Sequence, residues 1–259
     1  MSTWYEQYGE VGRARLAIEG CGMGEVEVFE PEALAGLPER AQRYLTHAIR
    51  PGVAVPSRAR VTFTGELRMR PGGRWLRFRA IETLVVARGF VFSARSRLGP
   101  VPVTNDERYD DGHAESRIRL FGFVPVVTKR GPDADRAMRS RLIVESVWLP
   151  STFLPAAGAR WATTGDDDLR VSVPVHGEDV TARLRVATGG QLHAVNLERW
   201  SDLHDGGAYG PVPFEVEVEA EDTFGGCTIP SRLRAHWWAG TDRQFEFFRA
   251  AVQQATFDL

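Results

Sequence analysis

The fold of this chain is decided by a stretch that reads RVTFTGELRMR over residues 60–70. Polar side chains alternate there with the apolar side chains of Val61, Phe63, Leu67 and Met69. Successive side chains of a strand point to opposite sides of a sheet, so a period of two is typical of a strand with one buried face. The stretch therefore predicts a half-buried β-strand.

The same alternation recurs along the chain, between turn signals built from glycine, proline and aspartate. The expected strands, about nine in all, are residues 60–70, 75–87, 90–97, 114–120, 169–176, 180–187, 192–200, 214–220 and 228–238. Strands that follow one another through short turns favour an antiparallel sheet over βαβ units. Such a sheet twists strongly and tends to curl or close. We therefore predict a large curved antiparallel sheet, in the form of a half-barrel or open barrel.

The last two expected strands allow a register to be predicted. If their turn centres on residues 224–225, Glu217 lies opposite Arg232 and Glu215 lies opposite Arg234. Opposite charges across strands stabilise a sheet by about 0.2–1 kcal/mol a pair. The core side of the pair is then expected to hold Phe214, Val216, Val218, Leu233, Ala235 and Trp237.

Several strands carry arginine at their polar positions. These arginines are Arg77, Arg79, Arg117, Arg119, Arg183 and Arg185. One interpretation is a solvated face of the sheet. The alternative is that curling strands point some of them into a hollow, where they meet an acidic ligand.

Three segments have the helical period of 3.6 instead. They are residues 30–50, 133–148 and 242–255. Pro31 suits the first turn of the first helix, and Asp133 can cap the second. The third would bury its phenylalanines on one side.

The expected architecture is α+β, with the sheet packed on two or three helices in a single domain over residues 1–259. In chain order it comprises an N-terminal extension (1–29), a helix (30–50), the antiparallel sheet (59–240) with an inserted helix near 133–148, and a C-terminal helix (242–255).

Composition argues against several classes of protein. The chain has 32 basic and 34 acidic side chains among 259 residues, whereas a nucleic-acid binder carries a basic excess or stripe. No run approaches the ~18 apolar residues of a membrane span, and residues 1–6 lack the cationic start of a secretory signal. Cys21 and Cys227 are too few for a disulfide framework, although a bridge between them stays open. We therefore expect a cytoplasmic protein without a transmembrane segment or a nucleic-acid partner.

The common cofactor and hydrolase motifs are absent from the sequence. A glycine-rich run, GCGMG over residues 20–24, is followed by strand-like residues where a phosphate loop needs a helix, so neither a Rossmann site nor a P-loop is expected. No Gly-x-Ser-x-Gly, His-Glu-x-x-His or Cys-x-x-Cys motif occurs. We therefore expect neither a cofactor nor a metal ion.

The densest polar cluster reads NDERYDDGH over residues 105–113. Asp106, Tyr109 and His113 within it could bind a divalent cation or take part in acid–base chemistry. The alternative is that the acidic residues serve the Asp-Gly turn.

A second candidate site lies on the expected middle helix. Arg141 and Glu145 are four residues apart, so they can pair on one side of the helix, beside the ring of Trp148. Near the hollow of the sheet, such a pair could shift the pKa of a carboxylate or hold a ligand head group. The alternative is an exposed ion pair worth ~0.3–0.5 kcal/mol.

Three segments of the chain form a recognisable set of motifs. They are LPERAQRYL over residues 37–45, Asp106-x-x-Tyr109-x-x-Gly112, and RLIVESVWLPSTFLP over residues 141–155 followed by Trp161. Together they resemble an uncharacterised bacterial domain family of unknown function, most clearly in the element Arg-x-x-x-Glu-x-x-Trp-x-Pro. The resemblance implies an antiparallel sheet wrapped on helices and no established activity. It also implies one recurring arrangement, structural or functional, of Asp106, Tyr109, Arg141, Glu145, Trp148 and Trp161.

The leading functional hypothesis is a binding protein. The hollow of the curled sheet would hold a small, mostly apolar molecule, lipid-like or polyketide-like, among aromatic side chains. Trp148 and Trp161 would supply contact area. Arg141, together with Arg95 or Arg119, would anchor an acidic head group.

An alternative is a cofactor-independent cyclase, isomerase or hydrolase that uses the same cavity, because holding a near-attack geometry promotes reaction. Glu145, Asp106, Tyr109 or His113 would then act as acid, base or hydrogen-bond donor. A third hypothesis is a protein-interaction module that uses the arginine face and forms salt-sensitive complexes.

Overall fold

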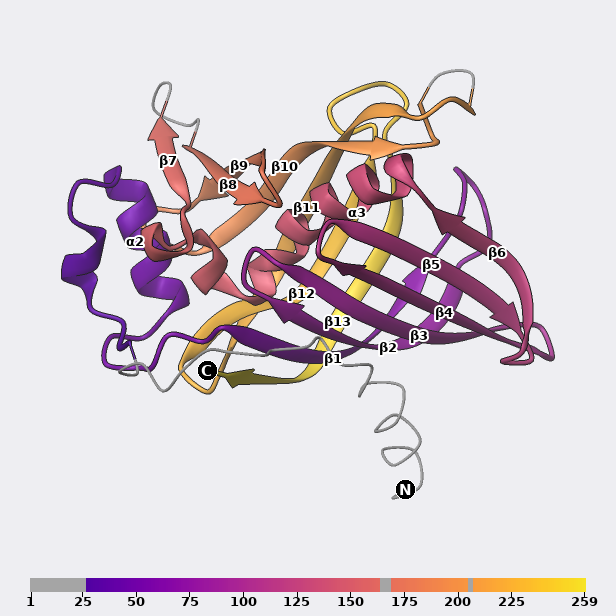
Figure 1. The fold of residues 1–259 in the computed structure, drawn as a ribbon, viewed down its shortest axis with the longest axis horizontal. Coiled ribbons are helices and arrows are strands. Elements are labelled where there is room, and N and C mark those ends of the chain that lie inside the picture. The colour runs from indigo at the N-terminus through magenta and orange to yellow at the C-terminus, as the bar shows by residue number, and fades with distance from the viewer. Residues whose placement is uncertain (1–26, 164–168, 205–206) are drawn as a thin grey trace.

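The computed structural model describes residues 27–163, 169–204 and 207–259, so the glycine-rich run 20–24 lies outside the described residues. Within them, thirteen strands form one antiparallel sheet in the order β6-β5-β4-β3-β2-β1-β13-β12-β11-β10-β9-β8-β7. The strands are β1 (Arg58–Leu67), β2 (Leu76–Val85), β3 (Gly89–Leu98), β4 (Val101–Asp110), β5 (His113–Leu120), β6 (Val124–Arg130), β7 (Arg160–Thr163), β8 (Leu169–Val175), β9 (Glu178–Val186), β10 (Leu192–Ser201), β11 (Gly210–Phe224), β12 (Cys227–Trp237) and β13 (Phe245–Asp258). The last strand joins two meanders, because β13 pairs with both β1 and β12 (Figure 1).

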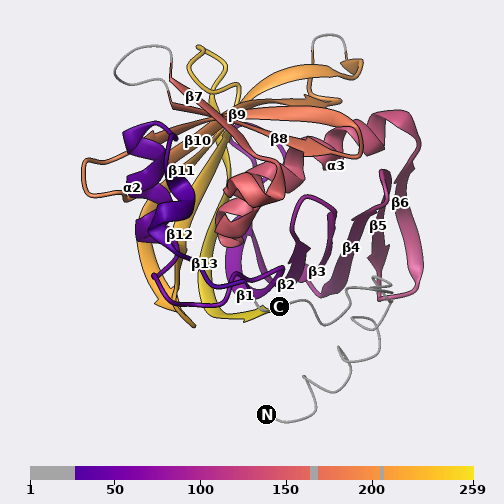
Figure 2. The same cartoon turned by 60° about the vertical axis from the view of Figure 1, so that its left-hand side comes forward.

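The sheet curls around the helix α3 (Pro132–Glu145), which crosses its concave side (Figure 2). This helix packs on β10, β9 and β3 to β6. It starts after Gly131, whose φ of 95° is a left-handed conformation that glycine adopts at low cost. The short turns η2 (Ser146–Trp148), η3 (Pro150–Phe153) and η4 (Pro155–Ala157) continue the chain. Much of the interior that the sequence predicts to be hollow is therefore occupied by α3 and these turns.

The first expected helix is divided in two. Residues Pro31–Leu34 form the 3₁₀ turn η1, and Glu39–Ala48 form the helix α2. Pro38 stands directly before α2, where its missing N–H costs no helical hydrogen bond. No helix in the described part of the chain is long and apolar enough to cross a lipid bilayer.

The C-terminal helix predicted over residues 242–255 is wrong, because this segment forms β13. Two β-bulges explain the error: the pairing with β12 shifts at Phe247, and the pairing with β1 shifts at Gln253. Each bulge inserts one residue into the period of two. Phe245 and Phe248 therefore reach the same side of the strand at a spacing of three, which mimics a helix.

The thirteen strands of the described residues exceed the nine expected, because β4, β6, β7 and β13 were not predicted. The second half of β4 carries the polar run NDERYD, which resembles a loop in composition but alternates between the two sides of the sheet. β6 is an edge strand whose side chains are exposed except for that of Val127, so burial imposes no period of two on it. β7 has only four residues.

The predicted register of β11 and β12 is shifted by two residues. Their turn centres on residues 225–226, two glycines with φ of 57° and 92°, as a two-residue hairpin turn requires. Glu217 therefore faces Arg234 and Glu215 faces His236, each two residues beyond the predicted partner. The predicted core side is confirmed in its buried members, which are Phe214, Val216, Leu233, Ala235 and Trp237.

The two faces of the sheet differ in polarity. The concave face, toward α3, carries the buried side chains, and the convex face carries most of the charged ones. All of the arginines predicted at polar strand positions fall on the convex face: Arg77, Arg79, Arg183 and Arg185 are exposed, and Arg117 and Arg119 are half-buried beside acidic residues.

Candidate functional site

The concave face holds a cluster of charged side chains around Arg141. The helical spacing of α3 directs Arg141 and Glu145 to the same side, where the arginine Nε donates to Glu145 Oε1 at 2.7 Å. Its Nη1 pairs with Glu107 of β4, and its Nη2 lies 3.7 Å from Glu82 Oε1 of β2. The guanidinium carbon also lies 4.8 and 4.7 Å from the centroids of two phenylalanine rings of β3. One arginine therefore ties α3 to two strands.

The three glutamates of this cluster differ in their electrostatics. Burial, and then the charge of Glu145, raises the pKa of Glu82 well above its usual value of 4.5. Burial also acts to raise the pKa of Glu107, but Arg141 and a hydrogen bond from Ser116 outweigh it and lower that pKa. Both oxygens of Glu82 and Oε2 of Glu145 have no hydrogen-bond partner. The cluster thus combines one carboxyl group, Glu82, that favours its protonated form with another, Glu107, that favours the charged form.

A second cation, the half-buried Arg199 of β10, lies on the same face. Its guanidinium carbon is 4.6 Å from the ring centroid of Phe214 and 4.9 Å from that of Trp237. Its Nε is buried without a hydrogen-bond partner, and no carboxylate among the described residues forms an ion pair with it. Burial, and then repulsion from Arg141, lowers the pKa of Arg199 to about 10, although the charges of Glu145 and Glu107 act to raise it, so the side chain stays charged at neutral pH.

Sequence reasoning missed Arg199 and Glu82, although the sequence carries a signal for both. Arg199 follows the buried Leu197 by two residues, and Glu82 follows the buried Ala80 by two residues. The alternation of a strand therefore places each charge on the apolar side of the sheet.

Aromatic side chains extend from Arg199 across the concave face; we call Phe214, Trp237, Phe247, Phe248 and Phe78 the aromatic row. The ring centroids of Trp237 and Phe247 are 5.5 Å apart, those of Phe247 and Phe248 are 5.8 Å apart, and Phe248 stacks on Phe78 at 5.3 Å. The bulge in β13 brings its two phenylalanines side by side. Both are only half-buried, so apolar surface next to Arg199 remains accessible.

Three of the predicted site residues lie on the convex face. Asp106 accepts hydrogen bonds from Ser93 Oγ at 2.7 Å and from Arg119 Nη1 at 2.5 Å, and the exposed Arg95 lies on the neighbouring strand β3. The alternation of β4 is the reason, because it points Asp106 and Glu107 to opposite sides of the sheet. The structure therefore does not bring Asp106, Arg95 or Arg119 together with Arg141.

Tyr109 and His113 also lie apart from the Arg141 cluster. Tyr109 is buried, its hydroxyl accepts a hydrogen bond from Arg139 Nε at 3.3 Å, and burial raises its pKa. His113 is largely exposed, with its Nδ1 3.8 Å from a carboxylate oxygen of Asp135.

Both predicted tryptophans are held within the protein. Trp148 is buried, donates its indole N–H to the carbonyl oxygen of Pro230 at 3.0 Å and packs on Phe63. Trp161 donates to the carbonyl oxygen of Phe153 at 2.9 Å. Of the predicted site residues, the structure joins Arg141 with Glu145 on the concave face and Asp106 with Arg119 on the convex face by direct contact.

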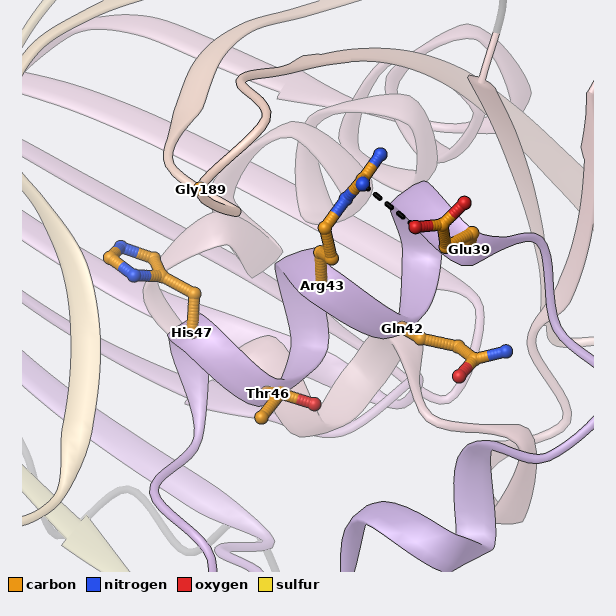
Figure 3. A pocket seen from close by; sticks show the side chains of 6 residues that line it. All are labelled: Glu39, Gln42, Arg43, Thr46, His47 and Gly189. Atoms are coloured by element: carbon orange, nitrogen blue, oxygen red, sulfur yellow. Dashed lines mark hydrogen bonds and ion pairs between the residues drawn. The ribbon is translucent and has the colours of Figure 1, made fainter.

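A separate surface pocket of about 420 Å³ lies along α2 (Figure 3). Its lining residues are Glu39, Gln42, Arg43, Thr46, His47 and Gly189. Arg43 pairs with Glu39 at 2.9 Å, and His47 Nε2 lies 2.9 Å from Glu221 Oε2. Because its basic side chains are paired, we place the candidate site at Arg199 and not here.

Comparisons with solved structures found likenesses at low sequence identity. A LolA superfamily protein from Nitrosomonas europaea is 10% identical with a TM-score of 0.49, and the match covers 85% of this chain and 93% of that chain. A DUF1329 family protein from Desulfovibrio piger is 8% identical with a TM-score of 0.43, over 79% of this chain and 87% of that chain. These likenesses concern the fold alone.

Comparisons of sequence identify the family. Curated proteins gave no match. The model of DUF6544, a family of unknown function, matches residues 27–250 and confirms the resemblance to an uncharacterised domain family. The chain therefore belongs to the DUF6544 family.

Proposed function

We propose that this chain binds an anionic amphipathic molecule on the concave face of its sheet. Arg199 would hold the anionic head group, and the aromatic row would contact the apolar part. The observation that carries the proposal is the half-buried side chain of Arg199, whose Nε is buried without a hydrogen-bond partner and which forms no ion pair with a carboxylate of the described residues. Removing a charge from water without an ion-pair partner destabilises the folded state. Cation–π contacts with aromatic rings offset about 2 kcal/mol of that cost. A bound anion would supply the missing partner.

The surroundings of Arg199 favour a ligand with an apolar part. Small-molecule sites are lined mainly by apolar side chains, with a few polar groups that fix orientation. Phe247 and Phe248 keep part of their surface exposed beside Trp237. The planar guanidinium suits a carboxylate or a phosphate. A fatty acid or a similar lipid-like anion combines both features.

In this proposal Arg199 takes the anchoring role that the sequence suggested for Arg141, Arg95 and Arg119. Arg141 already has carboxylates from three elements around it. It would act as a positioning residue that holds α3 on the sheet. Its charge also repels that of Arg199, which increases the benefit of an anion there.

The test compares two ligands that share an alkyl chain and differ in the charge of the head group. The affinities of the purified full chain for dodecanoate and dodecanol are measured by displacement of a fluorescent fatty-acid probe. A charge-assisted hydrogen bond contributes about 1.5–3 kcal/mol, so Arg199→Met should weaken dodecanoate binding by about tenfold or more. Dodecanol binding should change by less than about twofold, because the aromatic row is kept.

The matched control is Arg185→Met, which removes an exposed arginine of the convex face. It should leave both affinities unchanged. The proposal fails if the wild-type chain shows no saturable displacement, or if Arg199→Met and Arg185→Met have the same effect on dodecanoate.

A second candidate function is cofactor-independent acid–base catalysis on the bound molecule. The observation that favours it is Glu82, a buried carboxyl group whose pKa is raised by burial and by Glu145 beside it. Such a pair can supply a proton donor and an acceptor at one place. Glu82→Gln and Glu145→Gln should then abolish product formation while dodecanoate binding persists. Product formation is measured by mass spectrometry, with molecules extracted with the protein as substrates. Unchanged turnover in both variants would remove this candidate.

A further inference from the structure

The convex face carries a cluster of ligand-type side chains on the other side of the sheet from Arg199. Glu215 of β11 lies opposite His236 of β12. Glu217 follows Glu215 by two residues and so lies on the same side of its strand. One potential ligand atom from each, a carboxylate oxygen or an imidazole nitrogen, lies within 4.8 Å of the other two. No sequence motif predicted this cluster, because its members come from two strands.

We propose that Glu215, Glu217 and His236 form a site for a first-row divalent metal ion, with Zn²⁺ as the best match. Imidazole with carboxylates suits zinc and its neighbours, whereas Ca²⁺ and Mg²⁺ prefer oxygen ligands alone. Metal–ligand distances of about 2.0–2.2 Å place ligand atoms roughly 3–4 Å apart. Small rotations of the glutamates are enough to reach that spacing. Three protein ligands leave a fourth position open for water or a substrate.

His236 provides the observation that is independent of the acidic cluster. Its side chain is buried, at 7% exposure, and its Nδ1 has no hydrogen-bond partner. Buried polar atoms are nearly always paired, and an unpaired one costs about 1–3 kcal/mol. A metal ion would be bound by one nitrogen of the imidazole ring. The other ring nitrogen would then carry the proton, so metal binding fixes the tautomer.

The two carboxylates are also short of positive charge. Glu215 forms no ion pair within the described residues. The Nη2 of Arg234 lies 3.5 Å from Glu217, but its Nε lies closer, at 2.7 Å, to Glu219. Two carboxylates this close repel each other, and a shared cation removes that repulsion.

The remaining charges around His236 cancel. Glu246 of β13 faces His236 from the other side and is hydrogen-bonded by Arg249, with Nη2 to Oε2 at 3.1 Å. Arg234 is balanced by Glu219. The net charge offered to an ion is therefore that of Glu215 and Glu217.

The test measures metal binding by the tag-free full chain after chelator dialysis. Isothermal titration with Zn²⁺ should show one site per chain of micromolar affinity or tighter. Loss of one of three ligands should weaken binding by tenfold or more, so His236→Gln and Glu215→Gln are both measured. His193→Gln, at an exposed histidine of β10, is the matched control and should change the affinity by less than twofold.

A measurement on the unmodified chain keeps the proposal testable if a variant fails to fold. Co²⁺ added to the wild-type protein should give a visible absorption band that Zn²⁺ abolishes stoichiometrically. Absence of a Zn²⁺ heat and of a Co²⁺ band would overturn the proposal, as would equal affinities in the His236→Gln and His193→Gln variants. Because the site lies on the convex face, these outcomes are independent of dodecanoate binding at Arg199.

Discussion

Arginine side chains on the two faces of the sheet differ in exposure and in their ion-pair partners. On the convex face, Arg119 pairs with Asp106 across strands, and Arg77 pairs with Glu66 while remaining 90% exposed. On the concave face, Arg141 is surrounded by glutamates, and Arg199 is half-buried against two rings and forms no ion pair within the described residues. Water screens the first set, so each pair there contributes little to stability. The second set is largely shielded from water, so each charge there needs a partner more. Within the described residues, Arg141 has its glutamates, whereas Arg199 forms no ion pair.

From this comparison, we expect the largest change in the free energy of unfolding when Arg141 is replaced. Arg141→Met leaves the carboxylates of Glu107 and Glu145 buried without their cation, and breaking a buried pair costs about 3–5 kcal/mol. Urea denaturation should show a loss of this size in the free energy of unfolding. A loss below about 1 kcal/mol, as expected of a convex-face pair, would contradict the distinction between the faces.

The aromatic row should contribute less to the free energy of unfolding than the ion pairs of Arg141, but far more than exposed aromatic rings. Phe248→Ala removes a half-buried ring that stacks on Phe78 and should lower the free energy of unfolding by about 2–3 kcal/mol. Phe123→Ala, at a ring that is 75% exposed, is the control and should change it by less than about 0.5 kcal/mol. Equal effects would mean that the row does not pack as described.

Glu82 and Glu107 should give pH dependences of opposite sign. The pKa of Glu82 is raised in the folded state, so its contribution to stability is complete below pH 4.5 and is lost as the pH rises. Glu82→Gln should therefore gain stability relative to wild type above pH 4.5, by up to ~1.4 kcal/mol per pH unit. The pKa of Glu107 is lowered, so its contribution is present at neutral pH and is lost as the pH falls.

Urea denaturation of both variants from about pH 2.5 to pH 8 checks these signs, because the lowered pKa of Glu107 places its transition below pH 4.5. The stability deficit of Glu107→Gln relative to wild type should shrink toward acid pH. A difference between Glu82→Gln and wild type that does not vary with pH would show that Glu82 titrates normally.

The smallest effect is expected on the convex face. Arg119→Met removes one half-buried ion pair with Asp106 and should cost less than about 1 kcal/mol. The cost should shrink further in 1 M salt, because salt screens exposed charges. A cost comparable with that of Arg141→Met would erase the contrast between the faces.

Most of the sheet could be predicted from the sequence. Its strands are buried on one side, and this burial requires apolar and polar side chains to alternate along each strand. The strand at residues 60–70 and the core side of β11 and β12 follow from that pattern. β13 was predicted as a helix because bulges at Phe247 and Gln253 disturb the period. β6, at the sheet edge, has no period to detect because almost all its side chains are exposed.

The candidate site was predicted in part. The spacing of Arg141 and Glu145 identified their contact, because it is set within one helix. The contacts of Arg141 with Glu82 and Glu107 depend on how three elements meet, which no local pattern contains. Arg199 was missed because its neighbours along the chain are mostly polar. Its position two residues after the buried Leu197 nevertheless places it on the concave side of the strand.

The central claim is that Arg199, half-buried on the concave face without an ion-pair partner in the described residues, is there to bind an anion. The most direct test is the free energy of unfolding of wild type and Arg199→Met, each measured by urea denaturation with and without saturating dodecanoate. Without ligand, Arg199→Met should be the more stable protein by about 1 kcal/mol, because a partly buried charge without an ion-pair partner is removed. With dodecanoate the order should reverse, because only the wild type gains the full binding free energy. The same order of stability in both conditions would contradict the claim.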